Sequence, residues 1–281
     1  MKKGLIKKVV ASALLGIMTM GLVGCGSADN TSSKETKDLL ETIQEKGKVV
    51  VGMSADYAPY EFHYIDENGK DVIGGFDVDI ANEIADAIGV ELVIQEMDFD
   101  ALVAALPAGK IDLVISGMNP TEERAKVVDF SEIYYNSQHG ILVRAEDVDK
   151  YKTFADLEGA KVGAQLGSTQ EQIAKNEIPN ADLQLLANVN NLILELKSGK
   201  VDAIIMEKPV AEMAVKSNPE LAVGQPTYEE ESGGNAVGIA KNNPELLAKV
   251  NEVIKELNET GKMDEYIVKA NELAGSVKIV E

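Results

Sequence analysis

The segment "AGKIDLVISGMNP" (108–120) is echoed ninety positions later by "SGKVDAIIMEKP" (198–209). In each copy a Gly-Lys pair is followed by a β-branched residue, an aspartate and an apolar run. A short apolar run rich in branched residues predicts a buried strand. Different polar residues follow the two copies, so the repeat indicates two units of one architecture whose strand ends differ.

Strands and helices alternate around each copy. The order β-α-β-α-β is typical of a mostly parallel sheet covered by helices. The sequence therefore predicts the α/β class, with two doubly wound lobes. The expected strands span 48–54, 90–97, 110–118, 161–165, 181–187 and 200–206, and the expected helices span 76–89, 98–109, 168–178, 189–199 and 209–218.

The chain is expected to cross between the lobes twice, which makes a two-strand hinge. We place lobe 1 at 38–134 and 238–281, lobe 2 at 139–233, and the hinge at 135–138 and 234–237. Ligands of open parallel sheets lie at the carboxyl ends of the strands. The ligand pocket is therefore predicted between the lobes.

The N-terminus predicts processing and anchoring. A basic start, "MKKGLIKK", precedes an apolar run that ends in "LVGC" (22–25). This pattern resembles the lipobox of bacterial lipoproteins and predicts a signal peptide over 1–24 and lipidation of Cys25. The polar, small residues of 25–37 predict a flexible tether.

Composition and motifs argue against nucleic-acid binding, disulfide or zinc sites, and several classes of enzyme. The net charge is −20, which disfavours binding to nucleic acid. The chain has one cysteine, so a disulfide framework and a cysteine zinc site are excluded. Hydrolase triad order, zinc-protease and phosphate-loop motifs are absent from the sequence. We predict no catalytic residue, metal or cofactor, and solvent or hinge positions for His63 and His139.

Polar residues follow the strand of the first repeat. Ser116, Gly117 and Asn119 come at its end, and Thr121 can cap a helix that carries Arg124. Arginine offers a fork suited to a carboxylate. The alternative is a surface ion pair with a neighbouring acid.

The second lobe has its own polar strand ends. Gln165 closes one strand, and Ser168 and Thr169 begin the next helix, where backbone N–H groups and hydroxyls favour an anion. An ordinary N-cap is the alternative. Glu207 follows the repeated strand and suits an ammonium group, or else pairs with Lys208 at the surface.

Aromatic residues gather after the first strand. Ser54 ends that strand, Tyr57 follows it, and Phe76 begins the next helix. We expect Tyr57 and Phe76 to sandwich a ligand side chain, with cation–π attraction if it is positively charged. Asp56 and Glu61, in the same loop, could reach the far end of such a chain.

The motifs "ADYAPYEF", "GGFDVDIANEIA", "GMNPTEER", "LGSTQE" and "GKVDAIIMEKPVAE" together resemble the polar amino-acid substrate-binding proteins of ABC importers. The resemblance covers about 40–272. It implies the type II periplasmic-binding fold. It also implies these roles: Asn119, Arg124 and Thr169 for the α-carboxylate; Ser116, Gly117 and Glu207 for the α-amino group; Tyr57 and Phe76 for the side chain. Ser54, Asn119, Gln165 and Glu207 depart from the residues common in the family.

The sequence therefore predicts a monomeric receptor, lipid-anchored on the extracytoplasmic side of the cell membrane. It would bind a free amino acid and deliver it to an ABC permease with its ATPase. Arginine or lysine is favoured, with glutamine or asparagine next. The alternatives are an enzyme similar to cyclohexadienyl dehydratases on the same fold, or a ligand-sensing lipoprotein.

Overall fold

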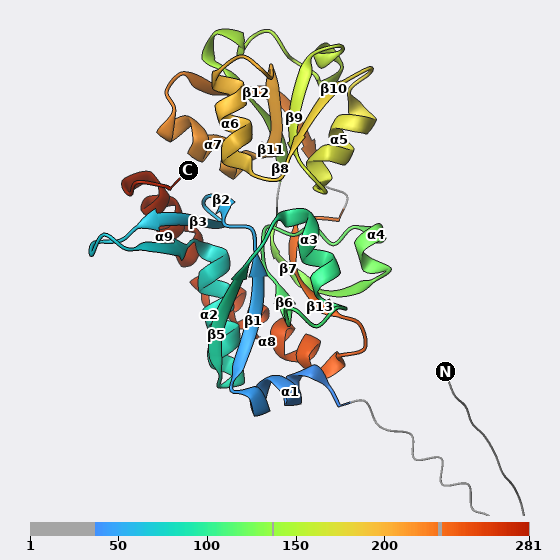
Figure 1. The fold of residues 1–281 in the computed structure, drawn as a ribbon, viewed down its shortest axis with the longest axis vertical. Coiled ribbons are helices and arrows are strands. Elements are labelled where there is room, and N and C mark those ends of the chain that lie inside the picture. The colour runs from blue at the N-terminus through green and yellow to red at the C-terminus, as the bar shows by residue number, and fades with distance from the viewer. Residues whose placement is uncertain (1–36, 137, 230–231, 281) are drawn as a thin grey trace, which may run out of the picture. The chain divides into compact units, whose positions relative to one another are not determined.

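The computed structural model describes residues 37–136, 138–229 and 232–280. Two five-stranded sheets, each flanked by helices, form two lobes (Figure 1). The predicted α/β class with two lobes is confirmed. The predicted signal peptide and Cys25 lie outside the described residues, as does all of the tether except Lys37.

The first lobe has the strand order β5-β1-β6-β13-β7. Strand β1 pairs parallel with β5 and β6, whereas β13 runs antiparallel to β6 and β7. The strands are β1 (Lys48–Met53), β5 (Glu91–Glu96), β6 (Leu113–Val114), β7 (Val128–Tyr135) and β13 (Asn235–Ala240). The helices are α1 (Leu39–Lys46), α2 (Phe76–Ile88), α3 (Phe99–Ala105), α4 (Glu122–Ala125), α8 (Pro244–Thr260) and α9 (Lys262–Ser276).

The second lobe has the corresponding order β10-β9-β11-β8-β12. Here β9 pairs parallel with β10 and β11, and β8 runs antiparallel to β11 and β12. The strands are β8 (Gln138–Arg144), β9 (Lys161–Gln165), β10 (Asp182–Leu186), β11 (Ala203–Glu207) and β12 (Leu221–Glu229). The helices are α5 (Thr169–Glu177), α6 (Val189–Lys197) and α7 (Lys208–Ser217), with 3-10 turns at Ala145–Asp147 and Phe154–Leu157.

The repeated segment supplies the central strand of both sheets. Strands β6 and β11 are third in their sheets. The aspartate just before each strand accepts a backbone hydrogen bond from the neighbouring parallel strand. Asp112 Oδ2 accepts the backbone N–H of Val50 on β1 at 2.9 Å, and Asp202 Oδ2 accepts that of Lys161 on β9 at 3.1 Å. The shared aspartate therefore fastens each central strand to its parallel neighbour.

A small antiparallel sheet, which the sequence did not predict, extends the first lobe. It consists of β2 (Asp56–Tyr57), β3 (Glu61–Ile65) and β4 (Asp71–Gly74). It begins just beyond the carboxyl end of β1. This position carries Asp56 and Tyr57 to the edge that faces the second lobe (Figure 1).

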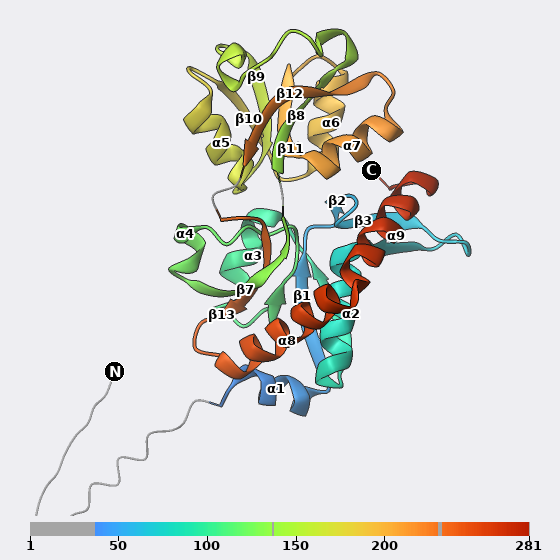
Figure 2. The same cartoon turned by 180° about the vertical axis from the view of Figure 1, so that it is seen from behind.

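The chain passes between the lobes twice, from β7 to β8 and back from β12 to β13 (Figure 2). Helices α6 and α7 of the second lobe lie on the same side of the molecule as β3 and α9 of the first, and α7 contacts α9. Within the described ranges, no helix has the length and apolar character of a membrane span.

Candidate ligand-binding site

Side chains from both lobes enclose a small cavity at the carboxyl ends of β1, β6 and β9. Its volume is about 10 Å³, enough for about one water molecule. The lobes are therefore closed on each other, and a ligand larger than water can enter only when they part. Six of the predicted site residues line the cavity: Ser54, Tyr57, Ser116, Gly117, Asn119 and Gln165.

Four other residues complete the lining: Asp56, Glu61, Phe99 and Gln170. The sequence reasoning named the two acids but missed Phe99 and Gln170. Phe99 opens α3 just after β5, so it also stands at a strand end on this edge. Applying the strand-end rule to β5 would have found it.

Phe76 does not reach the cavity, which corrects the predicted aromatic pair. Its side chain is fully buried in the first lobe, with its ring centroid 4.4 Å from that of Tyr60 and 5.5 Å from that of Tyr135. Phe99 takes its place beside Tyr57 in the lining. The guanidinium carbon of Arg124 lies 5.3 Å from the Phe99 ring centroid.

Arg124 lies where the two lobes meet. Thr121 caps α4 and accepts the N–H of Arg124 at 3.3 Å, which fixes where the arginine leaves the chain. Its Nη1 donates to Asn119 O at 2.8 Å, and its Nη2 donates to Gly167 O of the other lobe at 2.9 Å. Thr169 Oγ1 donates to Asn119 Oδ1 at 2.9 Å. The structure thus brings together the three residues predicted around a carboxylate.

Ser168 and Gln165 support this edge from the second lobe. Ser168 caps α5 by accepting the N–H of Glu171 at 3.2 Å, and its hydroxyl donates to Gln165 O at 2.6 Å. The amide of Gln165 donates to Ala187 O at 3.0 Å. Ser168 therefore acts as an N-cap, which was the alternative interpretation of this residue. Ser168 and Arg124 also both line an adjoining recess.

Glu207 is fully buried at the end of β11. Its carboxylate accepts the Tyr60 hydroxyl and the amide of Asn235, the latter at 3.1 Å, and its backbone N–H donates to Tyr57 Oη at 3.0 Å. Tyr57 Oη also accepts Gln170 Nε2 at 3.0 Å. Two tyrosines of the first lobe are thereby bonded to the second lobe in the closed arrangement.

Acidic side chains gather around the cavity. Burial raises the pKa of Asp56 from 3.8 to about 6 and that of Asp77 from 3.8 to about 7. Burial and the neighbouring charge of Asp77 raise the pKa of Glu61 well above 4.5. Of the ten residues that line the cavity, none is Lys or Arg. In their ionised form these acids would have no lysine or arginine partner in the cavity wall.

Glu61 and Asp77 form a buried carboxyl pair. Ser116 Oγ donates to Glu61 Oε1, while Asp77 Oδ2 accepts Gly117 N at 2.8 Å and Tyr134 Oη at 3.0 Å. The other two oxygens, Glu61 Oε2 and Asp77 Oδ1, accept no N–H or O–H from a neighbouring group among the described residues. The two carboxyl groups interact with each other. Burial and the charge of Asp77 raise the pKa of Glu61 and so favour its protonated form, which can donate to Asp77.

The two histidines stand apart from the cavity lining. His63 on β3 bonds to Asp71 at 2.8 Å and Glu96 at 3.1 Å. His139 is fully buried on β8, so the predicted solvent or hinge position is wrong for this residue. Within the described part of the chain, no three His, Cys, Asp or Glu side chains are grouped to hold a metal ion.

Comparisons with known proteins identify the family of this chain. The family model of bacterial extracellular solute-binding proteins, family 3, matches residues 49–270. The chain belongs to this family. It is 36% identical to the arginine-binding extracellular protein ArtP of Bacillus subtilis over 267 residues, which cover 94% of this chain and 96% of ArtP.

Two further relatives of this solute-binding family are similar over most of their length. A probable histidine-binding protein of Campylobacter jejuni is 35% identical over 269 residues, 94% of this chain and 98% of that protein. The crystal structure of AbpA from Streptococcus pneumoniae, an amino acid ABC transporter substrate-binding protein bound to L-arginine, has a TM-score of 0.81 and 41% identity. It covers 83% of this chain and 98% of AbpA. The fold is thus that of type II periplasmic-binding proteins, as the resemblance implied.

Proposed function

We propose that this protein binds a free cationic amino acid, arginine before lysine, between its lobes and delivers it to an ABC importer. The observation that carries the proposal is the cluster of buried acids around a cavity whose wall contains no basic side chain. Burying a charge is costly unless it is paired. A ligand with a positive side chain would supply the missing partner.

Tyr57 and Phe99 would contact the ligand side chain. Both line the cavity, with Asp56 and Glu61 beside them. Aromatic faces attract a guanidinium or ammonium group, more strongly where water is excluded. This set of residues favours arginine over glutamine, because an amide would leave both carboxyls without a counter-charge.

The opposite end of the site would hold the amino-acid backbone. Arg124 and Thr169 belong to different lobes and meet at Asn119, so a carboxylate placed between them would contact both lobes. Glu207 is the acid available for the α-amino group, after exchanging its bond with Tyr60. Contacts that exist only when both lobes meet favour the closed state.

The setting of this activity is also part of the proposal. The leader and "LVGC" (22–25) support lipidation of Cys25, which would hold a monomeric receptor on the extracytoplasmic face near its permease and ATPase. The arginine-binding ArtP and the arginine-bound AbpA support the ligand class. We propose no chemical reaction and no cofactor.

Calorimetric titration tests the ligand. Protein lacking residues 1–25 is titrated with arginine, lysine, histidine, glutamine, cystine and glutamate at low and high salt. We expect arginine to bind most tightly. If glutamine binds more than about tenfold tighter than arginine, a difference of about 1.4 kcal/mol, the cationic ligand is wrong. If none of these amino acids binds, amino-acid binding itself is wrong.

A further inference from the structure

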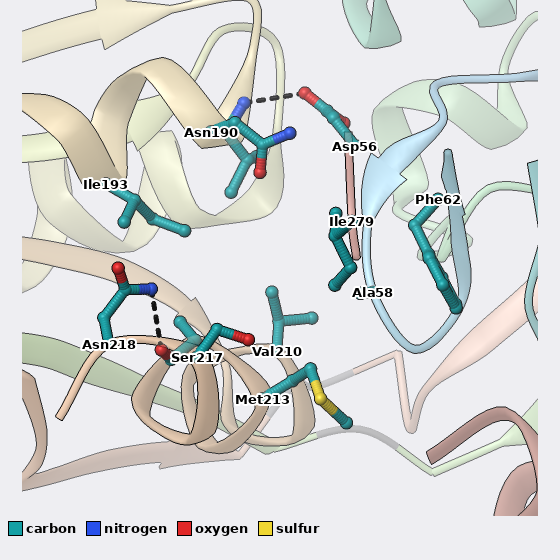
Figure 3. A pocket seen from close by; sticks show the side chains of 12 residues that line it. Asp56, Ala58, Phe62, Asn190, Ile193, Val210, Met213, Ser217, Asn218 and Ile279 are labelled. Carbon is teal, nitrogen blue, oxygen red and sulfur yellow. Dashed lines mark hydrogen bonds between the residues drawn. The ribbon is translucent and has the colours of Figure 1, made fainter. Parts of the chain in front are cut away.

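Asp56 connects the two lobes outside the contacts described for the ligand backbone. It begins β2 in the first lobe, and its Oδ2 accepts the backbone N–H of Val189, the first residue of α6 in the second lobe, at 2.6 Å. Figure 3 shows the Asp56 side chain pointing across to the start of this helix. Only 8% of Asp56 is exposed.

The helix end needs such a partner. The first N–H groups of a helix have no acceptor within the helix. In α6 the N-cap Asn188 accepts the N–H of Asn191 at 3.1 Å, which leaves the N–H of Val189 to an external group. The positive end of the helix dipole also favours a carboxylate there.

The same carboxyl group also faces the ligand cavity. Its other oxygen, Oδ1, accepts the Ser54 hydroxyl at 3.3 Å, and both residues line the cavity. Asp56 therefore contacts the cavity and the opposite lobe with one rigid group.

Apolar side chains lie on the far side of the bond. Ile193 and Val210 of the second lobe face Phe62 and Ile279 of the first across a recess that Asp56 also lines (Figure 3). Asp56 is buried beside these side chains, and a buried hydrogen bond is stronger than one in water.

We propose that Asp56 is a closure latch, a positioning residue whose bond to the start of α6 stabilises the closed lobes for any ligand that fits. The bond exists only when β2 meets α6, and parting of the lobes returns both groups to water. A contact made in one of two states shifts the population toward that state. The ligand arm of the test below rests on the proposed function, whereas the exchange arm does not.

Two substitutions separate the latch from a ligand contact. Asp56→Ala removes the acceptor and leaves the Val189 N–H unsatisfied, whereas Asp56→Asn keeps a carbonyl acceptor and removes the charge. Asp38→Ala is the matched control, because Asp38 caps α1 within one lobe by accepting the N–H of Leu40 at 3.0 Å.

The ligand arm compares arginine with its uncharged analogue citrulline by calorimetry. A latch predicts that Asp56→Ala weakens citrulline binding by about 10- to 100-fold, because citrulline also needs closure. Arginine, which on the proposed function also loses a counter-charge, should weaken at least as much. Asp56→Asn should restore citrulline to within about threefold of wild type, and Asp38→Ala should leave both affinities unchanged. Weaker arginine binding with unchanged citrulline binding in Asp56→Ala would make Asp56 a ligand contact and overturn the latch.

The exchange arm measures amide hydrogen exchange at Val189 in the ligand-free protein. We expect faster exchange in Asp56→Ala, near wild-type exchange in Asp56→Asn, and no change in Asp38→Ala. Equal exchange in wild type and Asp56→Ala would overturn the latch even if arginine binds. Failure of arginine to bind wild type, with Val189 protected as expected, would instead reject the proposed function alone.

Discussion

Raising the pH from 5 to 8 should destabilise the ligand-free protein, because it ionises carboxyl groups that burial keeps protonated. Burial raises the pKa of Asp77 from 3.8 to about 7 and that of Asp56 from 3.8 to about 6. For a pKa raised by folding, the stabilisation is fully present below the unfolded pKa. It is lost as the pH rises through the folded one.

The magnitude follows from these two pKa values. Each pH unit between the unfolded and folded pKa is worth about 1.4 kcal/mol. Between pH 5 and pH 8, Asp56 should lose about 1 kcal/mol and Asp77 about 2–3 kcal/mol of stabilisation. Glu61, whose pKa burial raises well above 4.5, acts in the same direction. The total is a large part of the 5–15 kcal/mol typical of folded proteins.

Urea denaturation at pH 5, 6, 7 and 8 measures this slope. Burial lowers the pKa of His63, but hydrogen bonds to Asp71 and Glu96 more than offset this, so that pKa is raised. His63 would lose stabilisation in the same window, and the series therefore uses a His63→Gln background. Asp77→Asn is the matched variant, because an amide oxygen can still accept from Gly117 N and Tyr134 Oη.

We expect the fall in unfolding free energy between pH 5 and 8 to shrink by about 2 kcal/mol in Asp77→Asn. Constant or rising stability across this range in the parent protein would refute the reasoning. It would mean that the buried acids are ionised and paired in the ligand-free protein.

Four further predictions concern the ligand and the anchor. Arg124→Ala should weaken arginine binding by about 30-fold or more, because an unpaired buried carboxylate costs about 2–5 kcal/mol; calorimetry at wild-type affinity would contradict this. Phe99→Ala should weaken arginine binding about tenfold, whereas Phe76→Ala should mainly lower the melting temperature; the reverse pattern would restore Phe76 as the pocket wall. Arginine binding at pH 6 should release protons, because the ligand's positive charge favours ionised acids in the cavity wall. Proton release makes the binding enthalpy depend on the ionisation enthalpy of the buffer, and a buffer-independent enthalpy would contradict the prediction. Cys25→Ser should leave an uncleaved precursor, and normal processing would reject lipidation.

Much of the fold could be predicted from periodicity and strand length. The long helix α2 was expected over 76–89 and spans Phe76–Ile88, and the strand β9 was expected over 161–165 and spans Lys161–Gln165. The strand of the first repeat was expected over 110–118, but β6 is only Leu113–Val114. Its pairing with β1 and β13 is limited to those two residues, a tertiary constraint that the apolar run does not reveal.

There is also a physical reason why Phe99, and not the predicted Phe76, lines the cavity. Both residues open a helix after an extended segment, so local sequence gives them the same appearance. The N–H of Phe76 donates to Pro59 O at 3.2 Å and that of Asp77 to Tyr60 O at 3.0 Å, which ties the start of α2 beneath the Tyr60 loop. These two backbone hydrogen bonds orient the start of α2 so that the Phe76 side chain points into the hydrophobic core. Each joins residues seventeen positions apart, so no local pattern shows them.

The roles of the acids depend on tertiary contacts as well. Sequence placed Asp56 and Glu61 near the end of a cationic side chain, but Asp56 also contacts α6, far along the chain, and Glu61 pairs with Asp77. Asp77 sits one position after the helix start and looks like an ordinary acid of a first turn. Its burial at 0% exposure is what makes it titrate near neutral pH.

The buried acids connect closure with the choice of ligand. Closing the lobes without a cation leaves Glu61 and Asp56 in a cavity wall that contains no Lys or Arg, so protons must take the place of a counter-charge. On the proposed function, an amino acid with a neutral side chain would leave those protons in place, and its affinity would fall as they are removed at higher pH. Arginine would bring its own charge and replace them, so its affinity should hold or rise from pH 5 to pH 8. The protein would then select a cationic side chain chiefly because closing the lobes around a neutral one leaves the buried acids without a counter-charge.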